Sequence, residues 1–291
     1  MATSQKLRCR VQKITNHGDH VYTVDLTPER PVPRFKPGQF LHLTLDDYDP
    51  SGFWPESRVF SIASSPAQRN DLRISYSVRG KYTSRMENEL QEGRMVWVKL
   101  PYGDFVIRDA NNVALLAGGT GITAFIAFID GLTNEFHNNI FLAYGARKPE
   151  LLLYRDLIDA KAGINNGFHA FYFVETDDKN KSGSTKEQSP EFFTGYLSLE
   201  SIWNRLETFE FLLKPSKSSY RRKPVSSLFK TFWTPAFAGV RIKVDFQRSR
   251  LQNPQETIYY IAGPPAMIQA LTGNLLKKDI SPEMIKVDAW E

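Results

Sequence analysis

The chain has 291 residues, with 37 Lys or Arg, 32 Asp or Glu and one cysteine, Cys9. This length allows two domains with substantial cores. A single cysteine excludes a disulfide framework and any cysteine-ligated zinc or iron–sulfur site, and the histidines show no ligand spacing, so we expect no metal. Neither a signal peptide nor a transmembrane run is present, so we expect a cytoplasmic protein.

The positive charge is concentrated in one segment. Residues 211–250 hold ten Lys or Arg and one acidic residue, which leaves 27 basic and 31 acidic residues elsewhere. Aromatic residues among these cations could touch a membrane surface or nucleic acid. We favour a solvated loop instead and expect no nucleic-acid partner. Because so long a loop is unusual in a compact domain, we interpret residues 211–250 as an insertion.

The first hundred residues have the pattern of a β domain. Short alternating apolar runs separated by turn sequences predict six strands. These strands are Arg8–Ile14, His20–Leu26, Phe40–Leu45, Arg58–Ile62, Leu72–Val78 and Met95–Leu100. One helix is predicted at Ser84–Leu90, with Thr83 or Ser84 as its N-cap. Six short strands over this length favour an antiparallel Greek-key barrel, which we assign to residues 1–109.

From residue 111 onward, strands alternate with helices. The predicted strands are Val113–Ala117, Ile140–Tyr144, Phe168–Glu175, Thr257–Ala262 and Lys286–Trp290, and the predicted helices are Ile122–Leu132, Leu151–Ala162 and Ala266–Lys277. This alternation predicts a doubly wound parallel sheet, a nucleotide-binding α/β domain over residues 110–291. Between them, Gly195–Leu197 is interpreted as a strand end and Ser201–Leu206 as a short helix.

Two motifs lie in the predicted barrel. In Arg58-Val59-Phe60-Ser61, the guanidinium can hold a phosphate, the aromatic ring can pack a planar ligand, and Ser61 can place a hydroxyl beside it. A plain barrel strand explains the same residues. The second motif, Gly80–Ser84, opens a helix whose free amides and dipole favour an anion, with Lys81 adding charge. A simple capped helix is the alternative there.

Two further motifs follow strands of the predicted parallel sheet. Gly118-Gly119-Thr120-Gly121 lies between an apolar strand and an apolar helix, where glycines let a pyrophosphate approach backbone amides. Gly263-Pro264-Pro265 also stands between a strand and a helix, and its prolines preset the helix start. Each turn is also compatible with structure alone. Together they place two loops suited to ligand binding on one edge of the sheet.

These four motifs, in this order, resemble the ferredoxin–NADP reductase superfamily, which joins an FAD-binding barrel to an NAD(P)-binding domain. The resemblance covers about residues 5–175 and 257–290. It implies a flavin site formed by Arg58, Phe60, Ser61, Ile62, Tyr76, Val78, Gly80, Lys81, Thr83 and Ser84. It implies nucleotide binding by Gly119, Thr120, Gly121, Arg147, Gly263, Pro264 and Met267. Ser61 near the reactive flavin nitrogen and Trp290 over the flavin face are the implied catalytic residues.

The implied activity is transfer of electrons from NAD(P)H through FAD to a separate carrier, such as a ferredoxin, a flavodoxin or an oxygenase component. We expect FAD rather than FMN, and a monomer. Arg147 and Lys148 suit a 2′-phosphate, but the choice between NADH and NADPH stays open. The alternative is a non-autonomous FAD- and NAD(P)-binding electron-transfer or regulatory subunit of a larger complex.

Three positions depart from the family pattern. Ala262 stands where many members have a cysteine against the nicotinamide, so that thiol's contribution to hydride transfer is missing. Ala124 replaces a proline that often follows the glycine turn, which we expect to matter little. The basic segment 211–250 has no counterpart in the family, and part of it resembles translated dispersed repeats of bacterial genomes.

Overall fold

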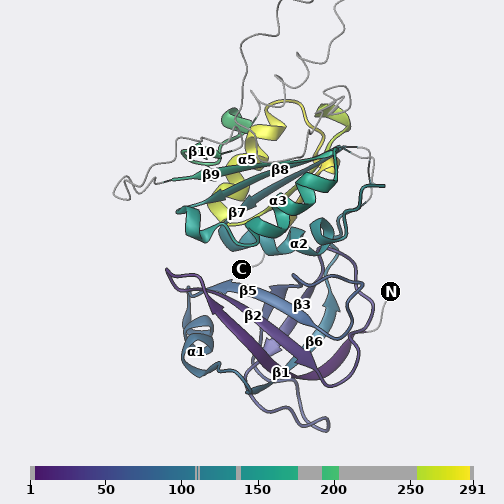
Figure 1. Ribbon diagram of the computed structural model, residues 1–291, viewed down its shortest axis with the longest axis vertical. Coiled ribbons are helices and arrows are strands. Elements are labelled where there is room, and N and C mark those ends of the chain that lie inside the picture. The colour runs from purple at the N-terminus through teal and green to yellow at the C-terminus, as the bar shows by residue number, and fades with distance from the viewer. Residues whose placement is uncertain are drawn as a thin grey trace, which may run out of the picture.

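The computed structural model describes residues 4–108, 110, 112–135, 139–175, 192–202 and 254–288. Figure 1 shows two parts, a β-barrel with one helix and a parallel sheet covered by helices, one above the other. The insertion at 211–250 and the implied catalytic Trp290 lie outside the described residues. The domain boundary expected after residue 109 stays a prediction, and it falls in the connection between the two sheets.

The first sheet is the predicted antiparallel Greek-key barrel. Its strands are β1 (Gln5–Asn16), β2 (Val21–Pro28), β3 (Phe40–Thr44), β4 (Arg58–Ser61), β5 (Leu72–Ser77) and β6 (Met95–Tyr102). They lie in the order β4-β3-β6-β1-β2-β5, with every neighbouring pair antiparallel. Alternation explains the fold, because Leu7, Cys9 and Val11 of β1 are buried while the residues between them are exposed.

Helix α1 (Lys81–Glu89) starts three residues before the predicted position. The prediction of Thr83 or Ser84 as N-cap is wrong, because Gly80 is the N-cap and Thr83 lies in the first turn. The Thr83 hydroxyl oxygen accepts hydrogen bonds from the amides of Arg79 and Gly80, at 2.9 and 3.1 Å. The Thr83 side chain, in the first turn, thus accepts hydrogen bonds from the two amides that precede the helix. Gly80 itself has an extended backbone conformation.

The second sheet is parallel throughout, as predicted. Its strands are β7 (Asn112–Gly118), β8 (Asn139–Ala146), β9 (Phe168–Val174), β10 (Phe192–Thr194), β11 (Ile258–Ala262) and β12 (Ile285–Asp288). Their order is β10-β9-β8-β7-β11-β12. All seven residues of the central strand β7 are buried, as expected for a strand covered on both faces. The short strand β10 was not predicted, and it ends directly before the predicted strand end at Gly195.

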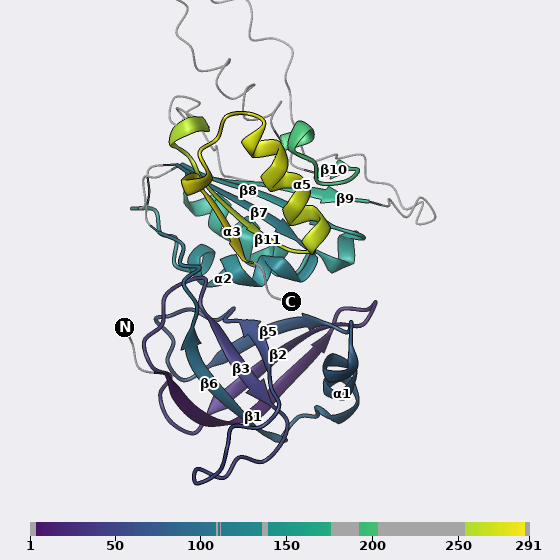
Figure 2. The same cartoon turned by 180° about the vertical axis from the view of Figure 1, so that it is seen from behind.

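Helices cover both faces of this sheet (Figures 1 and 2). Helices α2 (Thr123–Asp130) and α3 (Arg155–Ile164) pack on one face, and α5 (Pro265–Leu276) packs on the other. Residues 199–202 are helical, and the rest of the predicted helix Ser201–Leu206 lies outside the described residues. None of the helices in the described ranges has the length and apolarity that crossing a membrane requires.

Helix α2 also connects the two parts, since its Ala127 belongs to the apolar core of the barrel. Polar contacts cross the same boundary. The hydroxyl groups of Ser75 in β5 and Tyr154 before α3 are 2.6 Å apart. The amide of Arg108 donates to the hydroxyl of Tyr260 in β11 at 3.0 Å. These contacts fix the face of the barrel that lies against the parallel sheet.

Candidate functional site

A cavity of about 270 Å³ lies between the barrel and the parallel sheet. The predicted site residues that line it are Phe60, Ser61, Tyr76, Thr83, Thr120, Gly121, Gly263 and Pro264. The first four come from the barrel and the last four from the second part. Motifs separated by some two hundred residues of sequence therefore border one space.

The wall on the barrel side combines aromatic rings with hydroxyl groups, among them that of Ser61. Phe60 and Tyr76 have ring centroids 6.1 Å apart, and Tyr76 stacks on Tyr22 at 5.4 Å. Ser61 ends β4, where the strand opens into the cavity. Flat aromatic surfaces beside hydroxyl groups suit a planar ring that carries polar atoms at its edge.

Other residues predicted for the flavin site do not line this cavity. Ile62 is fully buried in the barrel core, and Val78 packs against that core. Lys81 and Ser84 stand in the first turn of α1 beside Gly80. The Arg58 guanidinium lies 5.1 Å from the centre of the Tyr82 ring and donates to the Ser57 carbonyl at 3.0 Å. Arg58 is half-exposed, and its guanidinium also lies 3.6 Å from a carboxylate oxygen of Glu56.

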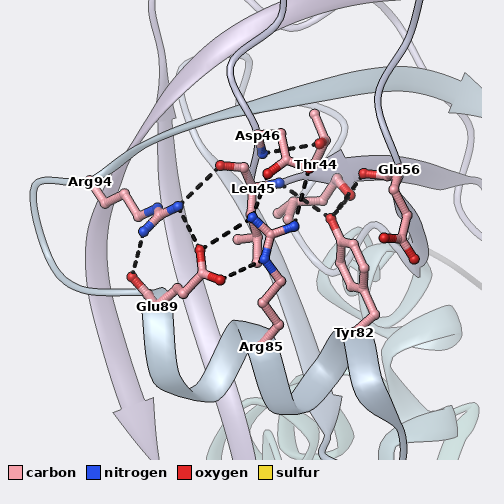
Figure 3. A network of polar contacts seen from close by, with 9 residues as sticks. Thr44, Leu45, Asp46, Glu56, Tyr82, Arg85, Glu89 and Arg94 are labelled. Carbon is pink, nitrogen blue, oxygen red and sulfur yellow. Dashed lines mark hydrogen bonds and ion pairs between the residues drawn. The ribbon is translucent and has the colours of Figure 1, made fainter.

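Helix α1 is held in place by the polar network of Figure 3. The buried Tyr82 hydroxyl donates to the Leu43 carbonyl at 2.9 Å and accepts from the Leu45 amide at 3.2 Å. Arg85 pairs with Asp46 and Glu89, and Arg94 binds Glu89 at 2.9 Å. This network ties the helix to the segment after β3.

The orientation of α1 follows from this anchoring. Its N-terminal turn, with Thr83, points into the edge of the cavity. A side chain built at Gly80 would meet nothing within 4 Å, so the space in front of this turn is open. Open space before free amides and the positive end of the helix dipole suits a phosphate.

The glycine turns after β7 and β11 lie side by side, because these strands are neighbours with Ala117 opposite Ala262. A Cβ built on Gly121 would be 2.3 Å from the Ala262 carbonyl oxygen, and one on Gly118 would be 2.5 Å from the Met267 sulfur. Only glycine allows this close approach. Gly119 has φ +53°, and open space lies in front of it.

A second cavity, of about 470 Å³, continues along the edge of the parallel sheet. It contains the predicted nucleotide residues Gly119, Thr120, Arg147, Pro264 and Met267. It shares Ser77, Arg79, Gly118, Thr120 and Pro264 with the first cavity. Its remaining wall is mainly apolar, with leucines from the loop before α3 and from residues 197–199. A long ligand in this cavity would extend one end to the first cavity.

The structure adds one residue that the sequence did not identify. Asp288, at the end of β12, is only 6% exposed and lines the first cavity. Its Oδ2 accepts a hydrogen bond of 3.4 Å from the Ser61 hydroxyl, and its Oδ1 has no partner among the described residues. Burial raises the pKa of this carboxyl to about 7. The signal available in the sequence was an acidic residue inside the predicted last strand, next to Val287.

Ala262 is fully buried at the end of β11, and it does not line the cavity. Its carbonyl oxygen instead lies so close to Gly121 that a side chain at position 121 would clash with it. The position where a family cysteine is usual therefore serves backbone packing here.

Comparisons with known proteins agree with this architecture. The oxidoreductase NAD-binding domain family matches residues 115–203. The NAD(P)H-flavin reductase of Aliivibrio fischeri is 28% identical over 151 residues, which are 48% of this chain and 61% of that protein. The reductase component of propane 2-monooxygenase from Mycolicibacterium smegmatis is 26% identical over 186 residues, 62% of this chain and 51% of that protein. The chain thus spans little more than half of these curated relatives.

A solved structure extends the likeness to the whole chain. A ferredoxin NADP⁺ reductase from Neisseria gonorrhoeae, with bound FAD and NADP, superposes with a TM-score of 0.64 over 99% of both chains at 16% identity. An antiparallel barrel joined to a parallel sheet is the fold that the chain shares with this reductase, as the resemblance to the ferredoxin–NADP reductase superfamily predicts. The second part of the chain also matches the oxidoreductase NAD-binding domain family.

Proposed function

We propose that this chain is an FAD-dependent NAD(P)H oxidoreductase. The observation that carries the proposal is the shared boundary of the two cavities, because Gly118 and Thr120 line both of them. A ring held against Phe60 and Ser61 in the first cavity would meet the end of a dinucleotide held in the second. Relatives named flavin reductase and oxygenase reductase component support this reaction class.

The residues present fit FAD. The aromatic wall at Phe60 and Tyr76 suits the flavin ring, and the unpartnered Oδ1 of buried Asp288 offers a partner to a polar ring atom. The open turn at Gly80 and Thr83 suits the pyrophosphate, for which Arg58 supplies a half-exposed guanidinium. When bound, the flavin would supply an acceptor for the hydride of the nicotinamide and release electrons singly or in pairs.

The protein's own contribution would be orientation, exclusion of water and control of one proton. The glycine turns let the dinucleotide lie against backbone amides. Asp288, with its pKa near 7 and its contact to Ser61, can hold a proton beside the ring or release it at neutral pH. We assign Ser61 and Asp288 as the proton-handling pair, and Trp290 stays a predicted cover of the ring.

We further propose a separate carrier protein as electron acceptor, either a ferredoxin, a flavodoxin or an oxygenase component. The relative that is named as a monooxygenase reductase component supports the last of these. We also propose that the chain divides into two domains after residue 109, with the basic insertion in the second domain.

A visible spectrum of the purified chain tests the proposal. We expect a yellow protein whose flavin band bleaches with NADH or NADPH, and steady NAD(P)H-dependent reduction of ferricyanide. A chain that stays colourless with added FAD would refute it. A chain that binds FAD but shows no turnover would instead favour the non-autonomous subunit.

A further inference from the structure

The second cavity has two ends that differ in their surroundings. One end, at Gly118 and Thr120, opens to the first cavity, so a nicotinamide must lie there to reach the flavin ring. The other end lies where β8 and β9 finish, at Arg147 and Glu175. Because a dinucleotide is elongated, its adenosine half extends toward this far end. That half carries the ribose hydroxyl of NADH or the 2′-phosphate of NADPH.

Glu175 lies next to Arg147 at this far end of the second cavity. Strands β8 and β9 are parallel with Ala146 opposite Val174, and the Glu175 amide donates to the Ala146 carbonyl at 3.2 Å. Arg147 and Glu175 therefore follow paired positions, and both line the cavity. An ionised carboxylate accepts hydrogen bonds from ribose hydroxyls and repels a phosphate.

The second cation, Lys148, is already paired across the domain boundary. Its ammonium nitrogen is 3.0 Å from both carboxylate oxygens of Asp19, in the turn between β1 and β2. The hydrogen bond to Lys148 holds the pKa of Asp19 below its ordinary value, and the charge of Arg147 acts in the same direction. Asp19 is thus ionised at neutral pH, and its charge acts on both cations.

We infer that Asp19 and Glu175 make this site select NADH over NADPH, an inference that rests on the proposed function. Among the described residues, the two cations at this end are balanced by two carboxylates, because Arg147 lines the cavity with Glu175 and Lys148 pairs with Asp19 beside it. Arg79 lines both cavities, so it lies at the end of the second cavity that borders the first and not at the far end. The ribose hydroxyls of NADH, in contrast, can donate to Glu175.

Two measurements on the full-length flavin-loaded chain test the inference. Calorimetry compares the affinity for ADP-ribose with that for 2′-phospho-ADP-ribose, and kinetics with ferricyanide compares kcat/KM for NADH and NADPH. We expect the wild type to favour the unphosphorylated member by about tenfold or more in both. In the double variant Asp19→Asn/Glu175→Gln, the ratio should fall by about tenfold through tighter binding of the phosphorylated ligand.

We expect the fold to tolerate these two substitutions. Asp19 has φ +48°, a conformation that asparagine also adopts readily. Lys148→Gln should strengthen the preference for NADH, because it frees the Asp19 charge. The matched control is Glu283→Gln, which removes an exposed carboxylate just before β12, at the edge of the sheet opposite the cavities. Its ratio should equal that of the wild type.

The outcomes separate the inference from the proposed function. Equal affinities in the wild type, a preference for the 2′-phosphate, or an unchanged ratio in the double variant would overturn the role of Asp19 and Glu175 while flavin reduction still stands. A flavin-loaded chain that neither binds nor oxidises any of these nucleotides would refute the proposed function, and this inference with it.

Discussion

Replacing Asp288 with asparagine tests the protonation that burial imposes on this residue. Asp288 is 6% exposed and its pKa is raised to about 7 from an ordinary 3.8, chiefly by burial, while the Ser61 hydrogen bond opposes the shift. Because the folded-state pKa is raised, the folded state binds the proton more tightly than the unfolded chain does. Stability from this group is therefore complete below pH 3.8 and is lost progressively as the pH rises to about 7.

The size of the effect follows from the two pKa values. A difference of one pKa unit corresponds to about 1.4 kcal/mol, so ionising buried Asp288 costs at most about 4 kcal/mol above pH 7. Near pH 5 the cost is only about 1.5 kcal/mol, since most of the folded protein still holds the proton. Asparagine is neutral throughout. Relative to the wild type, Asp288→Asn should therefore gain about 2–3 kcal/mol between pH 5 and pH 8.5.

Chemical denaturation of both proteins at several pH values from 5 to 8.5 measures this difference. Asp104→Asn, at an exposed aspartate after β6, is the control and should show no comparable trend. The same Asp288→Asn variant should lose turnover, by about 10²-fold if the carboxyl is a general acid, while flavin content is kept. A stability difference that does not vary with pH would refute the reasoning about buried charge.

Four further substitutions probe the frame of the site. Gly121→Ala should weaken nucleotide binding and raise the KM for NAD(P)H, because its Cβ would lie 2.3 Å from the Ala262 carbonyl oxygen. Gly80→Ala has nothing within 4 Å to meet, so it should keep the unfolding midpoint but lower the flavin content. Tyr82→Phe removes the hydrogen bonds of the hydroxyl to the Leu43 carbonyl and the Leu45 amide and should cost about 2 kcal/mol in denaturation. Tyr154→Phe removes a hydrogen bond between the two parts and should cost about 1 kcal/mol; an unchanged midpoint would show that water replaces it.

Local patterns predicted the two sheets well for a physical reason. Each barrel strand buries one face, so Leu7, Cys9 and Val11 alternate with exposed residues and show the period in the sequence. Strand β7 is apolar from Val113 to Ala117, as expected of a strand covered on both faces, and it ends at Gly118. The three-residue strand β10 is too short to show any period, which explains why it was missed.

The site was harder to predict because its parts are distant in sequence. Ser61 and Asp288 are 227 positions apart, and only the packing of the barrel against the parallel sheet brings them into contact. The ligand contacts expected of Ile62 and Val78 stay predictions. The side chains of these two residues pack in or against the barrel core, which the sequence around them did not show.

Polar pairs that join the two parts determine what each cavity can do. Ser61 meets Asp288, Ser75 meets Tyr154, and Asp19 meets Lys148. In each pair, one side chain comes from the barrel and the other from the parallel-sheet part, so neither part alone contains the proposed proton-handling pair or the proposed charge balance at the second cavity. Because Lys148 is held by a residue of the barrel, we expect a change in the barrel turn to alter nucleotide choice without touching the nucleotide motifs. On the proposed function, nucleotide specificity would then depend on how the two parts meet.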